Sequence, residues 1–482
     1  MSQINESAIK TPGVYVNEIP SFPPSIAQVA TAVPAFIGYT QKAINAIGND
    51  LTNKPTRISS LLEYEQYFGT AQPETDIQIT YTQTTAGTVT TDTISIAFAG
   101  GGNASKHNMY YAIRHFYANG GGVCYIVSSG PYKSIGTGLV DTELQAGLDA
   151  VRQQDEPTLI VFPEGQKLTE TEYYGLIEKA LKQCGDLQDR FVIMDLYSTG
   201  SDLHTSGDLT TASGNFRSGI TPDNNNYGAV YFPNLKTLYA FTYDETATSI
   251  VHTVDGAAGG LNGKKLSDIT TSNSAAYNLL KQAVRTQFPV ILPPSPAMAG
   301  IYAAVDGSRG VWKAPANVGV LDVSGTTFQV SDEMQGDLNI DPTSGKSINA
   351  IRAFTGKGVL VWGARTLDGN SNDFRYISVR RFYIMVEEST KLAAMQFVFE
   401  PNDGSTWVRI RAMIENFLTN LWRLGALAGS KPEQAFYVKV GLGQTMTFDD
   451  ILNGRLIVEI GMAPVRPAEF IILRFSQIQQ QA

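Results

Sequence analysis

The sequence predicts an α/β protein with extended arms at both ends. Short apolar runs alternate with helical stretches between residues 106 and 365, which is typical of βαβ units with a largely parallel sheet. From residue 366 onward, helical segments are followed by three strand-like runs, which predict an α+β domain with a small mixed sheet. Prolines interrupt the first 25 residues, where a helix is therefore excluded.

Residues 1–25 are expected to form an extended arm and linker. The run "GVYVNEI" is rich in strand-forming residues, and Pro20, Pro23 and Pro24 follow it closely. Glu18 is the only charged residue between Thr11 and Thr40. Disorder, a signal, or a strand meant for another chain would each explain such an apolar segment. The start of the chain lacks the basic and apolar regions of a secretory signal, which excludes the second explanation and leaves the other two open at this point.

Residues 26–365 are expected to form one α/β domain. A Thr-rich stretch at about 70–105 alternates in polarity and predicts a β-hairpin or loop insertion. Helices are predicted from residue 106 to an end at Asn119 and Gly120, over 141–154 and over 169–184, with strands over 123–129, 158–164 and 190–197 between and after them. Thr169 and Glu172 have the spacing of a capping box. Residues 198–226 are rich in Gly, Ser, Asn and Asp and are predicted to form a loop.

Residues 366–482 are expected to form a separate C-terminal domain that ends in a second arm. A long amphipathic helix is predicted over 406–427, since apolar side chains recur at helical spacing at Trp407, Ile410, Ile414, Phe417, Leu421 and Leu424. Three strands are predicted over 434–441, 454–464 and 468–477.

The composition narrows the class of protein. With 482 residues the chain is long enough for two or three domains, yet only 17% of its residues are charged, which is a low fraction for a soluble surface. The formal net charge of −9 argues against non-specific nucleic-acid binding. The charge is uneven, because residues from Gly345 onward hold 16 Lys and Arg against 12 Asp and Glu, whereas the preceding residues hold 20 against 33. Cys124 and Cys184 form no CxxC pair, and no apolar run is long enough to predict a membrane span.

No catalytic or metal-binding pattern is recognised. The four histidines lack a carboxylate or Cys partner at ligand spacing: His107, His115, His204 and His252. Gly345, Lys346 and Ser347 resemble the end of a phosphate-binding loop, but Ile340 stands where its first Gly is required. The stretch from Asp368 begins like a calcium loop, yet Val379 stands at the position of its bidentate Glu. The sequence therefore predicts a protein that is not an enzyme and needs no cofactor.

Several stretches resemble the contractile tail sheath family. They are "TPGVYVNEI", "SIAQVATAVPAFIG", "GIYAAVDGSRGVWKAPAN", "GKGVLVWGARTL", "VRRFYIMVEEST", "FVFEPNDGSTWVRIRAMIENFL" and "GRLIVEIGMAPVRPAEFIILRFSQ". The family comprises sheath subunits of contractile phage tails, R-type bacteriocins and phage-tail-like extracellular injection systems. The resemblance covers both ends and the third quarter of the chain, while residues 70–290 match mainly in layout.

The resemblance implies a structural subunit. Family members stack as rings of six around an inner tube, and the helical sheath contracts to drive that tube through a target envelope. The implied partners are other copies of the chain, the inner tube protein, and baseplate and terminal cap proteins, with no nucleic acid and no direct membrane insertion. Assembly is expected in the bacterial cytoplasm, as part of a phage tail or of a particle released from the cell. The α/β domain would lie outside, and residues 366–482 would face the tube.

The same resemblance suggests which residues join the subunits. Both arms are expected to add strands to the small sheets of neighbouring copies. The N-terminal donated strand would contain Val14, Tyr15, Val16 and Ile19, and the C-terminal one Ile471, Ile472, Leu473 and Phe475. The receiving sheet would contain Leu456, Ile457 and Val458. Basic residues on a helix near 378–396 are candidates for an easily released contact with the tube: Arg380, Arg381 and Lys391.

Other interpretations remain open at this stage. The arm could be an edge strand within its own chain, and Lys391 could simply pair with Glu387 on a solvated helix face. The protein could also be a static tube or shell component, or an α/β enzyme whose site is not recognised.

Overall fold

The computed structural model describes residues 25–101, 104–198, 203–221 and 223–474, and it divides them into two compact units. Residues 30–385 together with 466–474 form the first, here called the α/β unit, and residues 25–29 together with 386–465 form the second, the C-terminal unit. The division therefore falls after Met385 rather than at residue 366, and the chain returns to the α/β unit at its end. The donated-strand candidates Val14, Tyr15, Val16, Ile19 and Phe475 lie outside the described residues.

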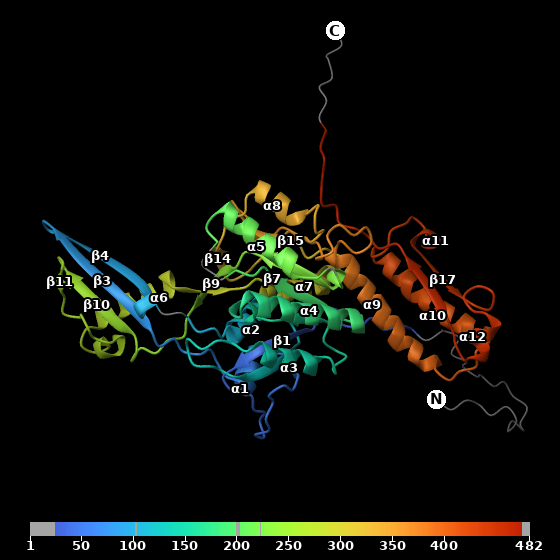
Figure 1. Ribbon diagram of the computed structural model, residues 1–482, viewed down its shortest axis with the longest axis horizontal. Coiled ribbons are helices and arrows are strands. Elements are labelled where there is room, and N and C mark those ends of the chain that lie inside the picture. Colours follow the sequence, from blue (N-terminus) through green and yellow to red (C-terminus); the bar gives the residue numbers. More distant parts are fainter. Residues whose placement is uncertain (1–24, 102–103, 199–202, 222, 475–482) are drawn as a thin grey trace, which may run out of the picture. The chain divides into compact units, whose positions relative to one another are not determined.

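A nine-stranded sheet forms the centre of the α/β unit (Figure 1). Its order is β13-β16-β15-β8-β7-β6-β1-β5-β2, and the six strands from β15 to β5 run parallel to one another. The strands are β1 (Pro34–Thr40), β2 (Thr56–Ile58), β5 (Cys124–Pro131), β6 (Leu159–Val161), β7 (Phe191–Asp195), β8 (Gly228–Phe232), β13 (Val318–Gly319), β15 (Ile348–Phe354) and β16 (Gly358–Val361). The predicted βαβ layout is confirmed.

Helices cover both faces of this sheet. They are α1 (Leu61–Phe68), α2 (Met109–Ala118), α3 (Asp141–Val151), α4 (Glu170–Leu187), α5 (Ser206–Gly219), α7 (Ser295–Arg309) and α8 (Asp332–Asn339). Consecutive strand residues point to opposite faces. In β1, Ile37 packs against Gly147 of α3, whereas Gly38 packs against Met109 of α2. The two helices therefore lie on opposite sides of the sheet.

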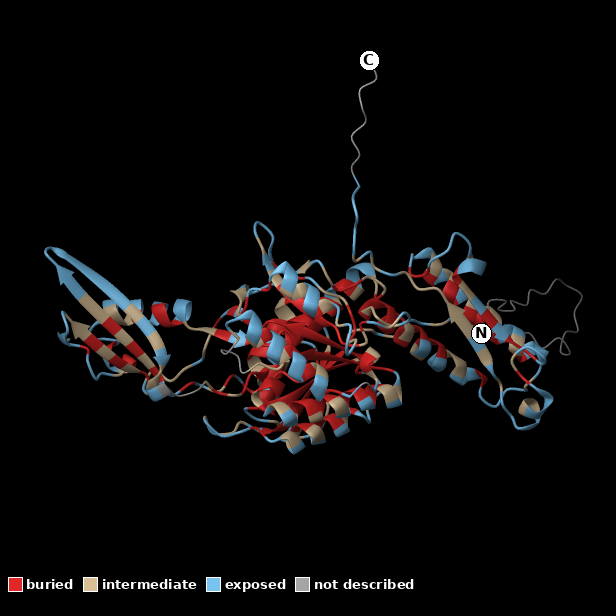
Figure 2. Cartoon of the chain, turned by 45° about the horizontal axis from the view of Figure 1, so that its top comes forward, coloured by how far each residue is buried: buried red, intermediate tan, exposed pale blue. Residues whose placement is uncertain are grey.

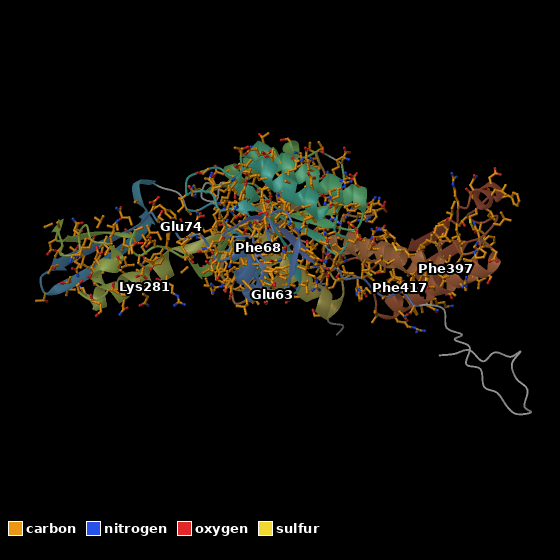
Figure 3. All side chains as sticks on the ribbon, turned by 90° about the horizontal axis from the view of Figure 1, so that it is seen from below. Glu63, Phe68, Glu74, Lys281, Phe397 and Phe417 are labelled. Atoms are coloured by element: carbon orange, nitrogen blue, oxygen red, sulfur yellow. The ribbon has the colours of Figure 1, made fainter. Side chains whose placement is uncertain are left out.

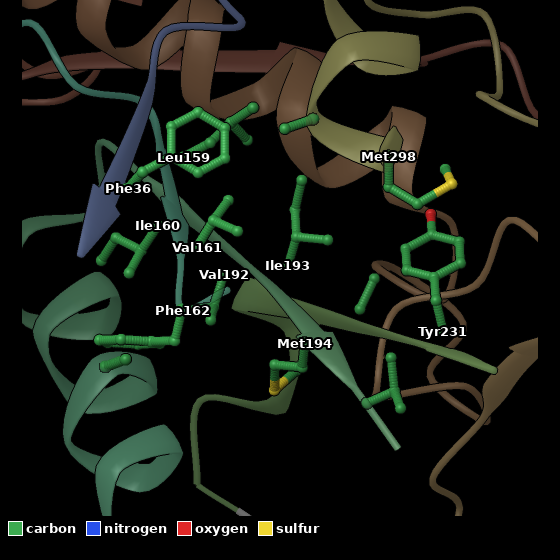
Figure 4. Packing of buried hydrophobic residues seen from close by; sticks show 14 of the residues in the cluster. Phe36, Leu159, Ile160, Val161, Phe162, Val192, Ile193, Met194, Tyr231 and Met298 are labelled. Carbon is green, nitrogen blue, oxygen red and sulfur yellow. The ribbon is translucent and has the colours of Figure 1, made fainter. Parts of the chain in front are cut away.

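The strands of this sheet are apolar on both faces, as a covered parallel sheet requires. Residues of β6 and β7 such as Ile160 and Ile193 are at most 1% exposed. Figure 4 shows them in one cluster, with Ile193 on the same face of the sheet as Phe36 of β1 and Ile160 on the opposite face. Packing on both faces makes the α/β unit a close-packed body.

The prediction of a loop over 198–226 was wrong in part, because α5 occupies Ser206–Gly219. Thr205 caps this helix, and Asp208 completes the capping box. Leu209, Ser213 and Phe216 are buried along one side. Tertiary packing of this short apolar stripe outweighs the poor helix propensity of its Gly, Ser and Thr residues.

The Thr-rich hairpin is confirmed, but it does not stand alone. β3 (Ile77–Ala86) and β4 (Val89–Phe98) pair in one register along their full length. β10 (Ser249–Val254) pairs with β3, and the sheet is completed by β11 (Ala257–Ala258), while α6 (Ser274–Gln287) contributes Leu280 and Val284 to its core. An isolated hairpin is marginal in water, which is why a distant segment of chain is needed to cover its apolar side. A separate three-stranded sheet contains β9 (Leu235–Ala240), β12 (Pro289–Leu292) and β14 (Val323–Thr326).

The C-terminal unit consists of helices packed on a two-stranded sheet. Its elements are the end of α9 (Ile377–Ala394), α10 (Gly404–Arg423), α11 (Pro432–Ala435), β17 (Phe436–Val440), α12 (Phe448–Leu452) and β18 (Val458–Met462). The predicted amphipathic helix is confirmed as α10, although it ends before Leu424, which is exposed. Phe417 of α10 and the nearby Phe397, both labelled in Figure 3, are buried in this unit. The predicted strand over 468–477 does not form within the described part, residues 468–474.

Gly147 offers a test of the helix-to-sheet packing. A Cβ atom at this residue of α3 would lie 2.6 Å from the Ile37 side chain, so we expect Gly147→Ala to destabilise the protein by about 1–3 kcal/mol. Gly175 of α4 is the matched control, since a Cβ there meets nothing within 4 Å. Gly175→Ala should instead stabilise the helix by about 0.5–1 kcal/mol. Urea unfolding of the purified subunit measures both changes, and equal effects would contradict the close approach of α3 to β1.

Candidate functional site

The edge of the central sheet where open α/β folds usually bind ligands is filled by the chain itself. The strand order reverses at β1, which lies between β5 and β6, and ligands in such folds sit beyond the carboxyl ends of the strands at this point. Here that place is taken by Glu164, which follows β6 and is 0% exposed. Its carboxylate accepts hydrogen bonds from the backbone N–H groups of Tyr39 at 2.9 Å and Asn108 at 3.0 Å. Glu164 therefore occupies the start of α2, where an anionic ligand would otherwise bind.

The surroundings of Glu164 are packed rather than open. The ring of His107 stacks on Tyr132 with centroids 4.7 Å apart, and its Nε2 atom accepts a hydrogen bond from the Lys133 backbone at 2.8 Å. Gly38 leaves room for the carboxylate, because a Cβ atom there would come within 2.9 Å of Glu164 Oε2. This arrangement joins β1, β6 and α2 and has a structural role.

Other buried ionisable groups also serve the packing. Burial raises the pKa of Asp195, at the end of β7, to about 7, and hydrogen bonds from Ser295 at the start of α7 oppose this rise. Burial likewise raises the pKa of Glu74 to about 7, and its carboxylate accepts hydrogen bonds from the Ser105 backbone at 3.0 Å. Burial lowers the pKa of His115 to about 4, so this ring is neutral near pH 7.

Among the described residues, no group of three or more His, Cys, Asp or Glu side chains is placed to hold a metal ion. None of the described helices combines the length and the apolar character that crossing a membrane requires.

The sheet of the C-terminal unit has open edges. β17 and β18 pair from Phe436 with Met462 to Val440 with Val458, and the described chain supplies no third strand to this sheet. Of the predicted receiving residues, Val458 opens β18, while Leu456 and Ile457 lie just before it. Unpaired N–H and C=O groups along such edges are a template for a strand from another chain.

The two faces of this small sheet differ. Val438 and Val440 are buried on the side of α10. On the other side, Tyr437 donates a hydrogen bond to Glu459 at 2.7 Å, and Lys439 lies 3.6 Å from the same carboxylate. These cross-strand contacts fix the register of the pair, and no strand of the described residues lies beside either edge.

The predicted C-terminal donated strand is extended and exposed. Ile471 and Ile472 are each 78% exposed and Leu473 is 72% exposed, and they belong to no helix or strand of the described chain (Figure 2). Together with Phe470, these residues make a contiguous apolar segment that the described residues leave in solvent. Exposed apolar surface of this kind marks an interaction site.

The start of this segment is held by a residue that the sequence analysis did not single out. Glu469 accepts hydrogen bonds from Arg365 at 2.7 Å, from Asn339 at 2.7 Å and from Tyr376 at 3.1 Å. Burial alone would raise the pKa of Glu469, but the hydrogen bonds from Arg365 and Asn339 keep this pKa below its usual value. The partners are separated from Glu469 by about a hundred residues, so no local pattern signals the pairing.

The structure separates the three residues predicted to contact a tube. Arg380 is 4% exposed and stacks on Tyr227, with its guanidinium 4.4 Å from the ring centre. Arg381 is 3% exposed and pairs with Asp306. The prediction treated both as surface charges, and it is corrected here because the first turns of α9 are packed inside the α/β unit. Lys391 alone is on the surface, where its ammonium group lies 3.0 Å from Glu388.

The known proteins that this chain resembles belong to phage tail sheaths and contractile injection systems. The phage tail sheath C-terminal domain family matches residues 370–478. The chain is 30% identical to one in the structure of an extracellular contractile injection system, the PVC sheath complex in its contracted state, with a TM-score of 0.64 and coverage of 97% of this chain and 98% of that one. It is also 30% identical to one in the sixfold-symmetrised anti-feeding prophage (AFP) baseplate, with a TM-score of 0.62 and coverage of 98% and 100%.

A curated relative matches over a shorter stretch. The tail sheath protein of Burkholderia phage BcepMu is 28% identical over 184 residues, which are 36% of this chain and 37% of the relative. The match thus spans little more than a third of that relative's length. The matches to the injection-system and prophage chains, in contrast, cover nearly the whole length of both chains.

Glu164 provides a test of the filled crevice. In Glu164→Gln an amide group replaces one carboxylate oxygen and faces the backbone N–H of Tyr39 or Asn108, so we expect a loss of about 2–4 kcal/mol in unfolding free energy. Glu333→Gln is the control, since Glu333 is exposed in the same unit, and it should change stability by less than about 0.5 kcal/mol. Urea unfolding measures both. If Glu164→Gln left the free energy of unfolding unchanged, this carboxylate would not hold the sheet edge together.

Proposed function

Because the chain belongs to the contractile tail sheath family, we propose that it is a sheath subunit whose copies stack as rings of six around an inner tube. Contraction of this helical sheath drives the tube through a target envelope. The observation that supports this most directly is the combination of an open-edged two-stranded sheet with an exposed, extended apolar segment at residues 470–473. The sheet offers backbone groups for a further strand, and the extended segment offers a strand without a partner among the described residues. Both occur in one chain.

The subunits are joined by exchanged strands. Ile471, Ile472 and Leu473 of one copy extend the sheet of a neighbour next to β17 or β18, so that main-chain hydrogen bonds hold the strand and alternate side chains set its register. Val14, Tyr15, Val16 and Ile19 form the second donated strand. Leu456, Ile457 and Val458 lie in the receiving sheet.

A single exchanged strand contributes modestly. Each main-chain hydrogen bond is worth about 1 kcal/mol net, and a strand of this length makes only a few. Every subunit of the sheath makes the same contacts, however, so the lattice stays linked while the units move as rigid bodies. The α/β unit, with its close-packed central sheet, suits this role.

The other partners follow from the same family membership. The inner tube, a baseplate and a terminal cap would complete the particle, and Lys391 is the remaining candidate for the tube contact. The match to a chain of an extracellular contractile injection system covers nearly all of both chains. This favours a particle that is assembled in the cytoplasm and then released. The subunit itself neither binds nucleic acid nor inserts directly into a membrane.

A non-enzymatic role agrees with the crevice geometry. In a doubly wound enzyme the switch point of the sheet holds the ligand, but here Glu164 fills it. Energy for contraction would come from the assembled sheath, which forms in a high-energy extended state and contracts to a lower-energy one.

Imaging of the assembled protein tests the function. We expect purified sheaths to exist at two lengths and to pass irreversibly from the long to the short form on heating, since two sets of interfaces differ in free energy. Electron microscopy before and after heating measures the lengths. Tubes of one fixed length at every temperature would instead identify a static shell protein.

Proline substitutions test strand exchange more finely. Successive N–H groups of a strand point in opposite directions, so of Ile471→Pro and Ile472→Pro only one removes a hydrogen bond to the receiving edge. We expect that variant to form at least about tenfold fewer full-length sheaths than the other, since a lost buried hydrogen bond recurs in every subunit. Negative-stain counts at equal protein concentration measure the difference. Deletion of residues 1–20 should likewise prevent long sheaths, and normal assembly of all three variants would refute strand exchange.

A further inference from the structure

The chain passes between its two compact units after Val29, after Met385 and after Val465. On the α/β side of these passages lie two clusters in which a carboxylate pairs with a buried arginine. The side chain of Asp306 is buried, and that of Glu469 is partly buried, at 21% exposed. We propose that Asp306 and Glu469 are anchoring residues that fix the root of each arm to the α/β unit. The root is the stretch where the described chain leads into an arm, residues 29–31 for the N-terminal arm and 468–469 for the C-terminal arm. An arm pulled by a neighbouring subunit then moves this unit instead of unravelling its own connection. The inference rests on the proposed function, because only a sheath that changes length pulls on its arms.

The first cluster holds the root of the N-terminal arm. Asp306 of α7 accepts a hydrogen bond from the Thr31 hydroxyl at 2.6 Å and a bidentate pair from Arg381 of α9, at 3.1 and 2.5 Å. Arg381 also donates to the Thr31 carbonyl at 2.9 Å and lies over the ring of Tyr302, 4.5 Å from its centre. The side chains of Arg381 and Asp306 are 3% and 7% exposed, so this contact between three distant segments is shielded from solvent.

A second contact ties the same root to α9. In the C-terminal unit, the backbone N–H of Val29 donates to the Ser389 hydroxyl at 3.1 Å. Thr31 and Val29 thus contact α9 at Arg381 and Ser389, and only Ala30 separates them. The N-terminal root is therefore bound to α9 on both sides of the passage from one unit to the other.

The second cluster holds the root of the C-terminal arm. Glu469 accepts from Arg365 through both guanidinium edge atoms, Nε at 3.0 Å and Nη2 at 2.7 Å, and Arg365 also donates to the Gly369 carbonyl at 3.2 Å. Tyr376 and Asn339 complete the ligation of the carboxylate. The next residues, Phe470 to Leu473, are exposed. Glu469 is thus the last held residue before the free apolar segment.

The chemistry of both clusters suits an anchor. A bidentate Arg–carboxylate contact fixes orientation as well as distance. When such a contact is buried, loss of one partner leaves an uncompensated charge, so the contact resists opening much more than an exposed ion pair does. Arg409 and Glu400 in the C-terminal unit form such an exposed pair, with side chains 48% and 42% accessible, and they serve as the matched comparison.

Distance measurements between spin labels test the proposal. Cys124 and Cys184 are buried, and burial raises the pKa of both thiols, so labels react selectively with newly introduced cysteines. Ser218 in α5 is exposed and serves as the common reference position. It is paired with Ala30 at the N-terminal root or with Ala468 at the C-terminal root, both of which are exposed. Labelled subunits are diluted with unlabelled ones before assembly.

Both roots should move with the α/β unit. We expect each distance to be narrowly distributed and unchanged between long and short sheaths. Glu469→Gln and Glu469→Ala should broaden the distribution from Ala468 and leave that from Ala30 narrow, whereas Asp306→Asn should do the reverse. Arg409→Gln should leave both narrow. The crossed pattern would not arise from general loss of folding, which thermal unfolding of each variant checks in addition.

Clear results would overturn the inference. A distance that differs between long and short sheaths of the unsubstituted protein would show that a root shifts against its unit, and narrow distributions in the Glu469 and Asp306 variants would show that these residues are not anchors. If the sheaths have only one length, the proposed function fails. The label distances in the unassembled subunit would still decide whether the two carboxylates hold the roots.

Discussion

The open edges of the β17–β18 pair are the constraint on which the assembly depends. Backbone N–H and C=O groups that no strand pairs must be solvated or matched by another chain, and two strands alone are marginally stable. α10 covers one face of this pair through Val438 and Val440, and its Arg411 donates a hydrogen bond to the Val440 carbonyl at 2.7 Å, but the helix adds no strand to the edges. In the proposed assembly, an exposed strand from a neighbouring copy would satisfy these edges. The incomplete sheet of one subunit would then favour the joining of subunits.

The α/β unit differs from the β17–β18 pair, because the packing of its sheet is completed within one chain. Its parallel sheet has helices on both faces, and the crevice that a doubly wound fold normally offers to a ligand is filled by Glu164. Hydrogen bonds from Tyr39 and Asn108 hold this carboxylate in place. A fold that is common among enzymes has its ligand crevice filled here, which illustrates that function depends on the site and not on the fold.

Ion pairs of buried arginines join distant segments within the α/β unit. Arg365 pairs with Glu469 and Arg381 pairs with Asp306, and all four residues belong to that unit. Such residues carry a cost of desolvation that apolar side chains would avoid, and their value lies in fixing one arrangement of distant segments. Under the anchoring proposal these segments are the roots of the arms, where an ill-defined geometry would misplace an exchanged strand.

The sequence by itself determined the α/β class, the Thr-rich hairpin, the amphipathic helix α10 and the strands β17 and β18. Each of these rests on a local periodicity or cap, such as Thr169 with Glu172, that nearby residues reveal. The family could be inferred as well, from short stretches at both ends. Sequence patterns failed at α5, whose Gly, Ser and Thr residues form a helix only because Leu209 and Phe216 are buried against other elements.

Only the tertiary structure decided which charges are free and where the arms are held. Arg380, Arg381 and Lys391 look alike in the sequence, yet Tyr227 and Asp306, which are distant in the chain, remove the first two from the surface. Glu469 finds Arg365 across 104 residues, and the hairpin β3–β4 finds β10 across a still longer separation. Periodicity reports which side of an element is apolar. It cannot report which distant segment will cover that side, because the partner is chosen by packing and by the pairing of buried polar groups across the whole chain.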